Sequence, residues 1–482
     1  MSELIGLAEP KRRTMHANIG TQTADAAPAE TPPRERLISI AYLLLRGMSA
    51  GGAFAMGFVQ TFTFARVLTP DRFSVFIVVG AIGYTLWLTD LGLAKILFVN
   101  LRAPHLDGRR DERAASQATA VIAFYIALAV GASLVCFAIS LLHHASSARG
   151  AMDLALFMLF ITLNLAWFSL RTLSIAVDIF IFFERLELVR RVVNIATMLA
   201  MLVGLPFSAF LILSNVLWAA LFAVAVTTLI SRGALTPHLR NTPHDLIAFF
   251  RLNAHSVARS STGALSGLVV ATFPYYFVSL VYGLGAAPII LEVTFRIFRG
   301  ACVIFAAICD LAIPGQTRAL AARDVDRLVR TTLLAVAMCC VPAAIGCGIL
   351  IFAGDWLFKF LLHSAAVVPH AIVPILVALL LASILQIVME ALLQYSGYFR
   401  SLAYNGLAVI AGMTAVVIVA LLGKFDIVVF LAAYTAVYSI GALVFTISAV
   451  LGPIRATAQQ ADTASPSGLS KFIRWTLQRS PA

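Results

Sequence analysis

Residues 192–231 read VVNIATMLAMLVGLPFSAFLILSNVLWAALFAVAVTTLIS and contain no charged residue over 40 positions. A helix rises 1.5 Å per residue, so this stretch is long enough for two crossings of a ~30 Å hydrocarbon core. Gly204, Pro206 and Ser208 interrupt the run, and these residue types favour a turn. The stretch therefore predicts a membrane-embedded helical hairpin.

The rest of the chain has the same character. It is 61% hydrophobic and 12% charged, with a mean hydropathy of +0.93, which leaves too little polar surface to cover a water-soluble globule. We predict an all-α, polytopic membrane protein with about 12 transmembrane helices. The predicted spans are 37–66, 73–94, 117–142, 152–180, 188–206, 209–231, 250–281, 287–312, 330–353, 367–392, 402–423 and 427–451.

The 35 Lys and Arg residues are distributed unequally between the two sides of these spans. With a cytoplasmic N-terminus, 25 fall in inside segments, among them 95–113 and 185–191, and five fall outside. This bias predicts that both termini are cytoplasmic, and we expect the protein in the cell inner membrane. The net charge of +12 is then explained by loops beside an anionic leaflet, so no nucleic-acid partner is expected.

The domain organisation follows from the spans. Residues 1–36 are polar and predict a disordered cytoplasmic tail without a cleavable signal peptide. Residues 37–231 and 250–451 predict two six-helix lobes joined by a cytoplasmic linker at 232–249. In the tail at 452–482, apolar residues recur at helical spacing and predict a short amphipathic helix on the inner leaflet, with a partner-binding helix as the alternative.

A weak internal repeat supports the two lobes. At an offset of about 213 residues, Arg46 and the small residues after it align with Arg259 and its followers, and Phe64 aligns with Phe277. Duplicated halves are common in transporters, which place the substrate site between them. Two pairs of glycines with small-xxx-small spacing predict close helix packing or a hinge. These pairs are Gly47 with Gly51 and Gly263 with Gly267.

Several motifs resemble one superfamily. The segments 65–76 (ARVLTPDRFSVF) and 88–93 (LTDLGL) resemble the start of polysaccharide flippases in the multidrug/oligosaccharidyl-lipid/polysaccharide exporter superfamily. Segments 273–285 and 394–400 are similar to later parts of the same pattern. One departure is Ser74, which stands where the family usually has Gly.

The resemblance covers residues 37–451 and implies a function. It implies that the chain flips a polyprenyl-diphosphate-linked oligosaccharide across the membrane for exopolysaccharide or surface polysaccharide biosynthesis, by alternating access of two lobes. The lipid bilayer and other polysaccharide assembly proteins are the expected partners. No cofactor is implied.

Five Arg residues lie within predicted spans, where a charge costs ~2.5–3.5 kcal/mol on insertion scales and usually faces a cavity or a partner. Guanidinium groups bind phosphate oxygens bidentately and stay charged when buried. We therefore predict a substrate-binding site formed by Arg46, Arg259, Arg296 and Arg299. The fifth, Arg171, is a weaker candidate.

Structural ion pairs are the alternative explanation for these charges. Glu292 lies one turn from Arg296 and could neutralise it, and Asp178 could neutralise Arg171. Glu292 is thus a coupling or ion-pair residue, and Glu390 is a candidate for binding a coupling proton. No metal-ligating spacing is present, and the six cysteines are interpreted as small core residues.

Two other functions compete with a flippase. A cation-coupled drug or metabolite antiporter of the same fold generally has an acid deep in the first or seventh helix, whereas 36–70 and 254–291 contain no Asp or Glu. A membrane glycan polymerase or ligase needs catalytic acids or bases on the outside, where the short turns offer few. We therefore predict a transporter and not an enzyme.

The topology can be tested with reporter fusions. Fusions after residues 111, 241 and 320 should report the cytoplasm, because the basic segments are retained inside. Fusions after 147, 284 and 425 should report the outside. A reporter on the opposite side at any of these positions would contradict the twelve-span topology.

Overall fold

The computed structural model describes residues 33–86, 93–106, 108–142, 147–238 and 242–460, and these form helices and short connections with no strand among them. The chain divides into a unit at 1–44, which is described only from residue 33, and a unit from Leu45 onward, to which the packing below belongs. In chain order the described helices are α1 (Pro33–Val67), α2 (Pro70–Thr85), α3 (Leu93–Leu106), α4 (Glu112–Leu142), α5 (Ala148–Ala176), α6 (Phe180–Ala200), η2 (Met201–Val203), α7 (Phe207–Ser231), α8 (Thr242–Tyr282), α9 (Ala286–Ala321), α10 (Val325–Leu362), α11 (Ile372–Tyr395), α12 (Phe399–Gly423), α13 (Ile427–Ala449), η3 (Val450–Ile454) and α14 (Arg455–Gln460).

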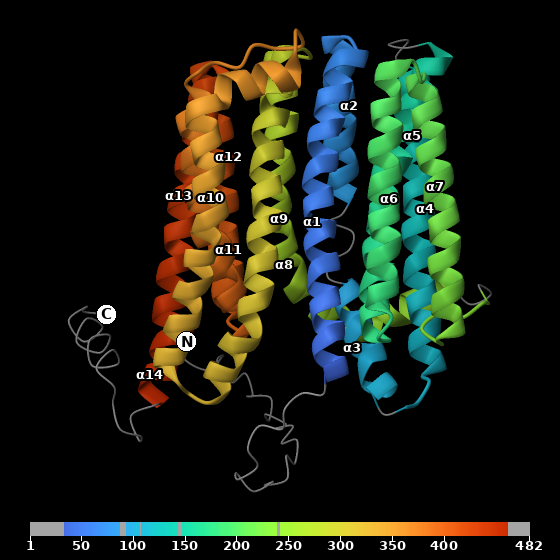
Figure 1. The fold of residues 1–482 in the computed structure, drawn as a ribbon, viewed down its shortest axis with the longest axis vertical. Coiled ribbons are helices and arrows are strands. Elements are labelled where there is room, and N and C mark those ends of the chain that lie inside the picture. Colours follow the sequence, from blue (N-terminus) through green and yellow to red (C-terminus); the bar gives the residue numbers. More distant parts are fainter. Residues whose placement is uncertain (1–32, 87–92, 107, 143–146, 239–241, 461–482) are drawn as a thin grey trace, which may run out of the picture. The chain divides into compact units, whose positions relative to one another are not determined.

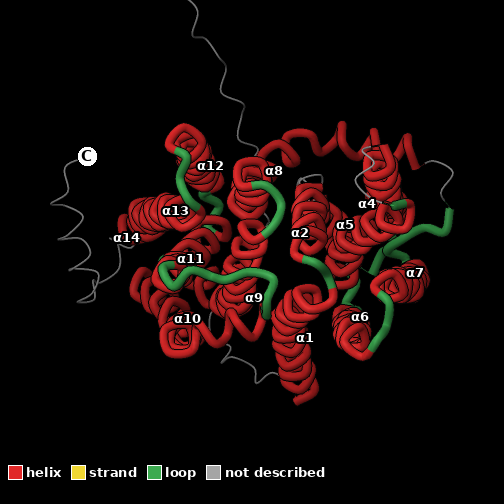
Figure 2. Tube along the Cα trace, turned by 90° about the horizontal axis from the view of Figure 1, so that it is seen from above, coloured by secondary structure: helices red, strands yellow, loops and turns green. Residues whose placement is uncertain are grey.

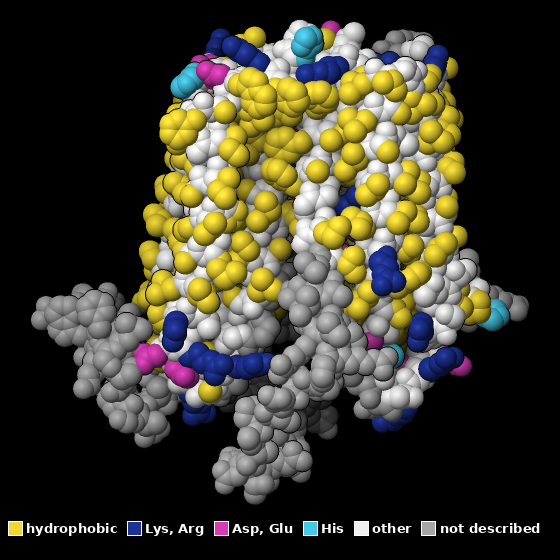
Figure 3. Space-filling model, in the orientation of Figure 1, with side chains coloured by type: hydrophobic (Ala, Val, Ile, Leu, Met, Phe, Trp, Pro, Cys, Tyr) yellow, Lys and Arg dark blue, Asp and Glu magenta, His cyan; other side chains and the backbone are white. Residues whose placement is uncertain are grey.

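The helices confirm a polytopic all-α membrane fold. Among the described residues, eight helices are long and apolar enough to cross a membrane: α4, α5, α7, α9, α10, α11, α12 and α13. The face seen in Figure 3 is largely hydrophobic between its two ends, and most of its charged side chains gather at those ends. The chain is therefore a multi-pass membrane protein.

Most predicted spans match a helix, but several helices extend beyond the predicted ends, by nine residues for α9 and α10. The span predicted at 188–206 begins eight residues earlier, at Phe180. The second span is described as α2 and α3, and the residues between them, 87–92, lie outside the description together with most of the 88–93 motif. The N-tail to residue 32 and the amphipathic segment near 469–477 also lie outside the described residues. The lobe boundary at 232–249 stays a prediction.

The hairpin that opens the sequence forms as predicted. Gly204 has φ 108°, a left-handed conformation that favours glycine, and it ends η2. The N–H of Leu205 donates to the carbonyl of Ala200 at 3.0 Å, and Pro206 is the N-cap of α7. Backbone chemistry thus divides one charge-free run into two antiparallel helices.

Helices from the two halves of the chain meet along α2, α8 and α9. Helix α5 packs against α2, α3, α4 and α7, and α9 packs against α10 and α11. Helix α2 also packs against α8 and α9. Seen from above in Figure 2, α2 lies between α5 and the α8–α9 pair.

Two phenylalanines related by the predicted repeat have parallel environments. Phe64 of α1 is 1% exposed and lies 5.3 Å, between ring centroids, from Phe207 in the first turn of α7. Phe277 of α8 is also buried and lies 4.5 Å from Phe430 in the first turn of α13. In each half, the first helix therefore packs on the start of the last helix, as a repeat requires.

The predicted glycine pair in α1 does not mediate packing. Nothing lies within 4 Å of a Cβ added at Gly47 or Gly51, and both residues are exposed. The prediction of close helix approach there was wrong, because the spacing places both glycines on an uncovered face. The side chains around Arg259, Gly263 and Gly267 lie outside the described set.

Arg66 joins the two halves near one end of the molecule. This residue lies in the last turn of α1. Its guanidinium donates to the carbonyls of Phe360 at 2.6 Å and Leu361 at 3.3 Å, in the last turn of α10. These carbonyls lack helical partners and carry the negative end of the helix dipole, so a cation stabilises them.

Truncating the buried aromatic core should destabilise the fold. Phe64→Ala should lower stability by about 2 kcal/mol, below the ~3–5 kcal/mol typical of soluble cores, because lipid tails provide no hydrophobic drive between helices and mainly the cavity cost remains. Thermal unfolding in detergent would measure the loss. Phe352→Ala, at a site 91% exposed, is the matched control and should leave the unfolding temperature unchanged. Equal shifts in both variants would contradict the assigned packing.

Candidate substrate-binding site

A cluster of charges lies on one face of α9, with a single carboxylate at its centre. Glu292 is 5% exposed and is paired with Arg296 one turn along the helix. It also accepts from the Arg299 guanidinium at 3.0 Å and from the Tyr275 hydroxyl of α8 at 2.5 Å. Two guanidinium groups and one carboxylate leave this cluster with a net charge of +1.

The cluster lies near mid-membrane. Arg296 and Arg299 are 10 and 13 residues from the start of α9. These separations correspond to ~15 and ~20 Å along a core ~30 Å thick.

The two guanidinium groups line a small cavity of about 70 Å³ between the halves of the chain. Arg296 donates from Nη1 to the Gln60 side chain of α1 at 2.9 Å, while its buried Nε has no partner among the described residues. The Arg299 guanidinium lies 5.7 Å from the ring centroid of Tyr84 in α2. Beside the cavity, Arg296 therefore keeps one buried N–H donor that no described protein group satisfies.

Helix α1 approaches this cluster through a glycine. A Cβ at Gly57 would lie 2.9 Å from Cδ of Arg296. From the other helix, a Cβ at Gly300 would lie 2.2 Å from the Phe54 ring. The close approach of α1 and α9 therefore requires glycine at Gly57 of α1 and at Gly300 of α9. Gly47 and Gly51 take no part in it.

A second buried charge cluster joins α5 and α6. Glu187 is 4% exposed and accepts from Arg190 at 2.7 Å and from Arg191 at 2.7 Å. The Trp167 indole N–H also donates to Glu187, at 2.7 Å. Nearby, Arg171 donates twice to Glu184, at 2.6 and 2.9 Å. Three arginines and two glutamates again leave a net charge of +1.

The second cluster reaches the same cavity. Asn164 of α5 lines the cavity, and its side-chain oxygen accepts from Arg190 at 3.1 Å. Arg191 packs on α1, since a Cβ at Gly52 would lie 3.2 Å from its Cδ. One cluster thus lies beside Gly52 and the other beside Gly57 of the same helix.

This second cluster bears on two predictions. Arg190 and Arg191, counted above in the inside segment 185–191, pair with Glu187 within α6. Arg171 is paired with Glu184 rather than Asp178, which binds Arg102 at 2.7 Å. The signal that was missed is the spacing of Glu187, three and four residues before the two arginines, which favours pairing on a helix.

The remaining predicted site residues are not brought into the cavity by described contacts. Arg46 and Arg259 lie in α1 and α8, but their side chains lie outside the described set, so their roles stay predictions. Glu390 lies on α11, where Gln386 donates to it at 3.5 Å, and it does not line the cavity. Within the described residues, no group of three His, Cys, Asp or Glu side chains could hold a metal ion, and all six cysteines are free.

Removing the acid of the second cluster should destabilise the protein. Glu187→Gln leaves Arg190 and Arg191 buried without a counter-charge, and breaking a buried pair in this way costs about 3–5 kcal/mol. A lower unfolding temperature in detergent would show the loss. Glu112→Gln, at the exposed start of α4, is the control. An unchanged unfolding temperature for Glu187→Gln would contradict the pairing.

Comparison with known proteins identifies the fold. No family model and no curated protein matches the sequence. An inward-facing multidrug resistance MATE family transporter of the MOP superfamily is 12% identical with a TM-score of 0.58, covering 89% of this chain and 100% of that one. A MATE structure in complex with MaL6 is 14% identical with a TM-score of 0.56, and the match covers 89% of this chain and 98% of that one. A MOP superfamily transporter from Pyrococcus furiosus, described as having a binding pocket of reversed polarity, is 12% identical with a TM-score of 0.57, covering 89% and 97%. The chain therefore has the fold of the MOP superfamily transporters, in agreement with the resemblance drawn from its motifs.

Proposed function

We propose that this protein is a transporter that flips a polyprenyl-diphosphate-linked oligosaccharide across the inner membrane. The observation that carries the proposal is the net positive, incompletely satisfied cavity at mid-membrane. Arg296 Nε is buried with no acceptor among the described residues. A buried donor without a partner costs about 1–3 kcal/mol, and a phosphate oxygen would satisfy it.

Charge on both sides of the cavity supports a diphosphate. Arg296 and Arg299 approach from α9, and Arg190 is linked to the cavity through Asn164 of α5. Each cluster has a charge of +1, so together they balance the two negative charges of a diphosphate diester. An organic cation has the same sign of charge as both clusters and would be repelled by them.

The size of the cavity supports transport by conformational change. Its volume of about 70 Å³ is well below the ~300–1,000 Å³ typical of ligand sites. In this conformation the helices close around the charges, so a diphosphate enters when the halves move apart. Alternating opening towards each side would carry the charged group across while its lipid tail stays in the bilayer.

A second candidate, cation-coupled drug antiport, is favoured by two observations. The solved structures of the same fold include multidrug resistance transporters. The described cavity also contains a buried carboxylate, Glu292, with a tyrosine hydroxyl as its neighbour. In that mechanism Glu292 would exchange a coupling cation for the drug.

The two functions are separated by transport assays in proteoliposomes. A polyprenyl-diphosphate-linked sugar labelled on the sugar should cross the bilayer in the wild type. Arg299→Ala and Arg296→Ala should each reduce the rate at least tenfold, because a lost charge-assisted contact contributes about 1.5–3 kcal/mol. Lys at either position should restore the rate only in part, because an ammonium cannot bind two oxygens in a fork.

Removing both members of the ion pair distinguishes substrate contact from structural pairing. If Arg296 only neutralises Glu292, the double variant Glu292→Gln with Arg296→Gln should transport normally; we expect it to stay inactive. Arg251→Gln, at an exposed position of α8, is the control and should retain the wild-type rate. Transport of ethidium but not of the glycolipid, abolished by Glu292→Gln, would establish the drug antiporter instead.

A further inference from the structure

A long groove lies outside the charged cavity, against α2, α4 and α5. It has a volume of about 1380 Å³, and its lining is apolar along most of its length. On α4, every residue of the outer part, 130–142, is at least partly exposed, whereas the buried residues of that helix lie between Ala114 and Ala129. Val135 and Ile139 of this uncovered part line the groove and are 57% and 51% exposed. Ser133 of this part donates to the carbonyl of Ala155 in α5 at 2.7 Å, so α5 covers one face of it and the face along the groove is left uncovered by the described residues.

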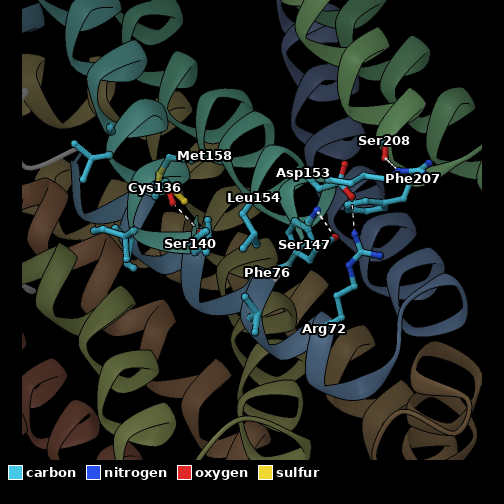
Figure 4. A pocket seen from close by; sticks show the side chains of 18 of the residues that line it. Arg72, Phe76, Cys136, Ser140, Ser147, Asp153, Leu154, Met158, Phe207 and Ser208 are labelled. Carbon is cyan, nitrogen blue, oxygen red and sulfur yellow. Dashed lines mark hydrogen bonds and ion pairs between the residues drawn. The ribbon is translucent and has the colours of Figure 1, made fainter. Parts of the chain in front are cut away.

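The mouth of the groove is polar and is built from three helix N-termini. Arg72 in the first turn of α2 binds Asp153 of α5 at 2.5 Å. Arg149 in the first turn of α5 donates to Ser208 in the first turn of α7 at 3.4 Å. These contacts are shown in Figure 4. Helix N-termini attract phosphate groups, and both arginines add positive charge at the same place.

Two groups at the mouth lack their usual partners. Arg149 is exposed and pairs with no acid among the described residues, so it is available to an anion. Asp153 is 2% exposed, and its Oδ1 has no hydrogen-bond partner in the described part of the chain. The mouth thus offers a guanidinium that has no described acid partner and a carboxylate oxygen that has no described donor. Together they complement the phosphate and the ammonium of a zwitterion.

The length of the groove fits one leaflet. Its lining on α2 extends from Arg72 to Leu86, 14 residues that span ~21 Å along the helix. One leaflet, including its headgroup region, measures ~20–22 Å, which is half of the ~40–45 Å bilayer. A chain anchored at the mouth would therefore reach the midplane and end there.

We infer that this groove binds one phospholipid with a phosphoethanolamine headgroup, with its phosphate at Arg149 and Arg72, its ammonium at Asp153 and an acyl chain along α2 and α4. The lipid would cover the exposed face of α4. It would also fix the angle between α2 and α4, and α2 is the helix that contacts Arg299 through Tyr84. The site is separate from the charged cavity, so it does not depend on which substrate is transported.

The inference is tested by native mass spectrometry of the full chain, delipidated in detergent and titrated with palmitoyl-oleoyl-phosphatidylethanolamine. A saturable one-to-one adduct is expected. Diacylglycerol with the same chains lacks the phosphate, and phosphatidylcholine lacks the N–H donors, so both should bind at least tenfold more weakly. Equal binding of either lipid would overturn the headgroup assignment.

Two variants locate the site. Nothing lies within 4 Å of a Cβ added at Gly131, so Gly131→Leu should fold, should fill the groove and should abolish the adduct. Gly346→Leu in α10 is the matched control, since its position is equally open and half-buried but lies outside the groove. Arg149→Gln should weaken binding about tenfold, the loss of one charge-assisted contact, while Arg232→Gln, exposed on α7, should not.

Other occupants give different results. An adduct that survives in Gly131→Leu overturns the site. A wild-type dimer that Gly131→Leu converts to a monomer would assign the groove to a second copy of the chain, and would also overturn the inference. Loss of transport in the Arg296 and Arg299 variants with an intact lipid adduct would show that the two sites are independent.

Discussion

The structure depends on how buried charge is neutralised in a membrane. An isolated charge in hydrocarbon costs several kcal/mol, and the chain surrounds two of its buried acids with donors. Glu187 binds two arginines and a tryptophan, and Glu292 binds two arginines and a tyrosine. Because each acid serves two arginines, neither cluster is neutral. The residual positive charge is concentrated on the two sides of one cavity, and that concentration is the chemical basis of the proposed substrate.

The position of α1 follows from these clusters. Arginine side chains fill the space on both sides of the helix, so α1 can pass between them only where it has no side chain of its own. Gly52 faces Arg191 and Gly57 faces Arg296. Residues 47–57 include seven glycines or alanines, but spacing alone does not tell which face of a helix is covered. For this reason the spacing of Gly47 and Gly51 gave a wrong prediction, although the general need for small residues in α1 was recognised.

The parts of the site that lie on one helix could be predicted, and those that cross between helices could not. Glu292, Arg296 and Arg299 follow one face of α9 at spacings of four and three residues, and the sequence is sufficient to place them together at mid-membrane. Tyr275, Gln60 and Asn164 come from three other helices and carry no local signal. The second cluster was missed for a different reason. Its arginines at 190 and 191 were counted as topological signals, because a positive charge near the end of an apolar run has the same appearance in a loop and in a buried pair.

Polar contacts join the two halves at their ends, whereas buried phenylalanines join the first and last helices within each half. Within each half, the first and last helices are joined by buried phenylalanines, whose separation would leave cavities. Between the halves near one end, the Arg66 guanidinium binds the terminal carbonyls of α10. Near the start of α4 and α8, Ser116 donates to Asp245. Each hydrogen bond of this kind contributes about 1–3 kcal/mol and can be replaced by water at an exposed end. If the halves alternate their access as proposed, these polar contacts must break at one end at a time, together with apolar contacts such as that of Phe62 with Phe360. Bending a half would instead disrupt its aromatic core, so rigid-body movement of the halves is the expected motion.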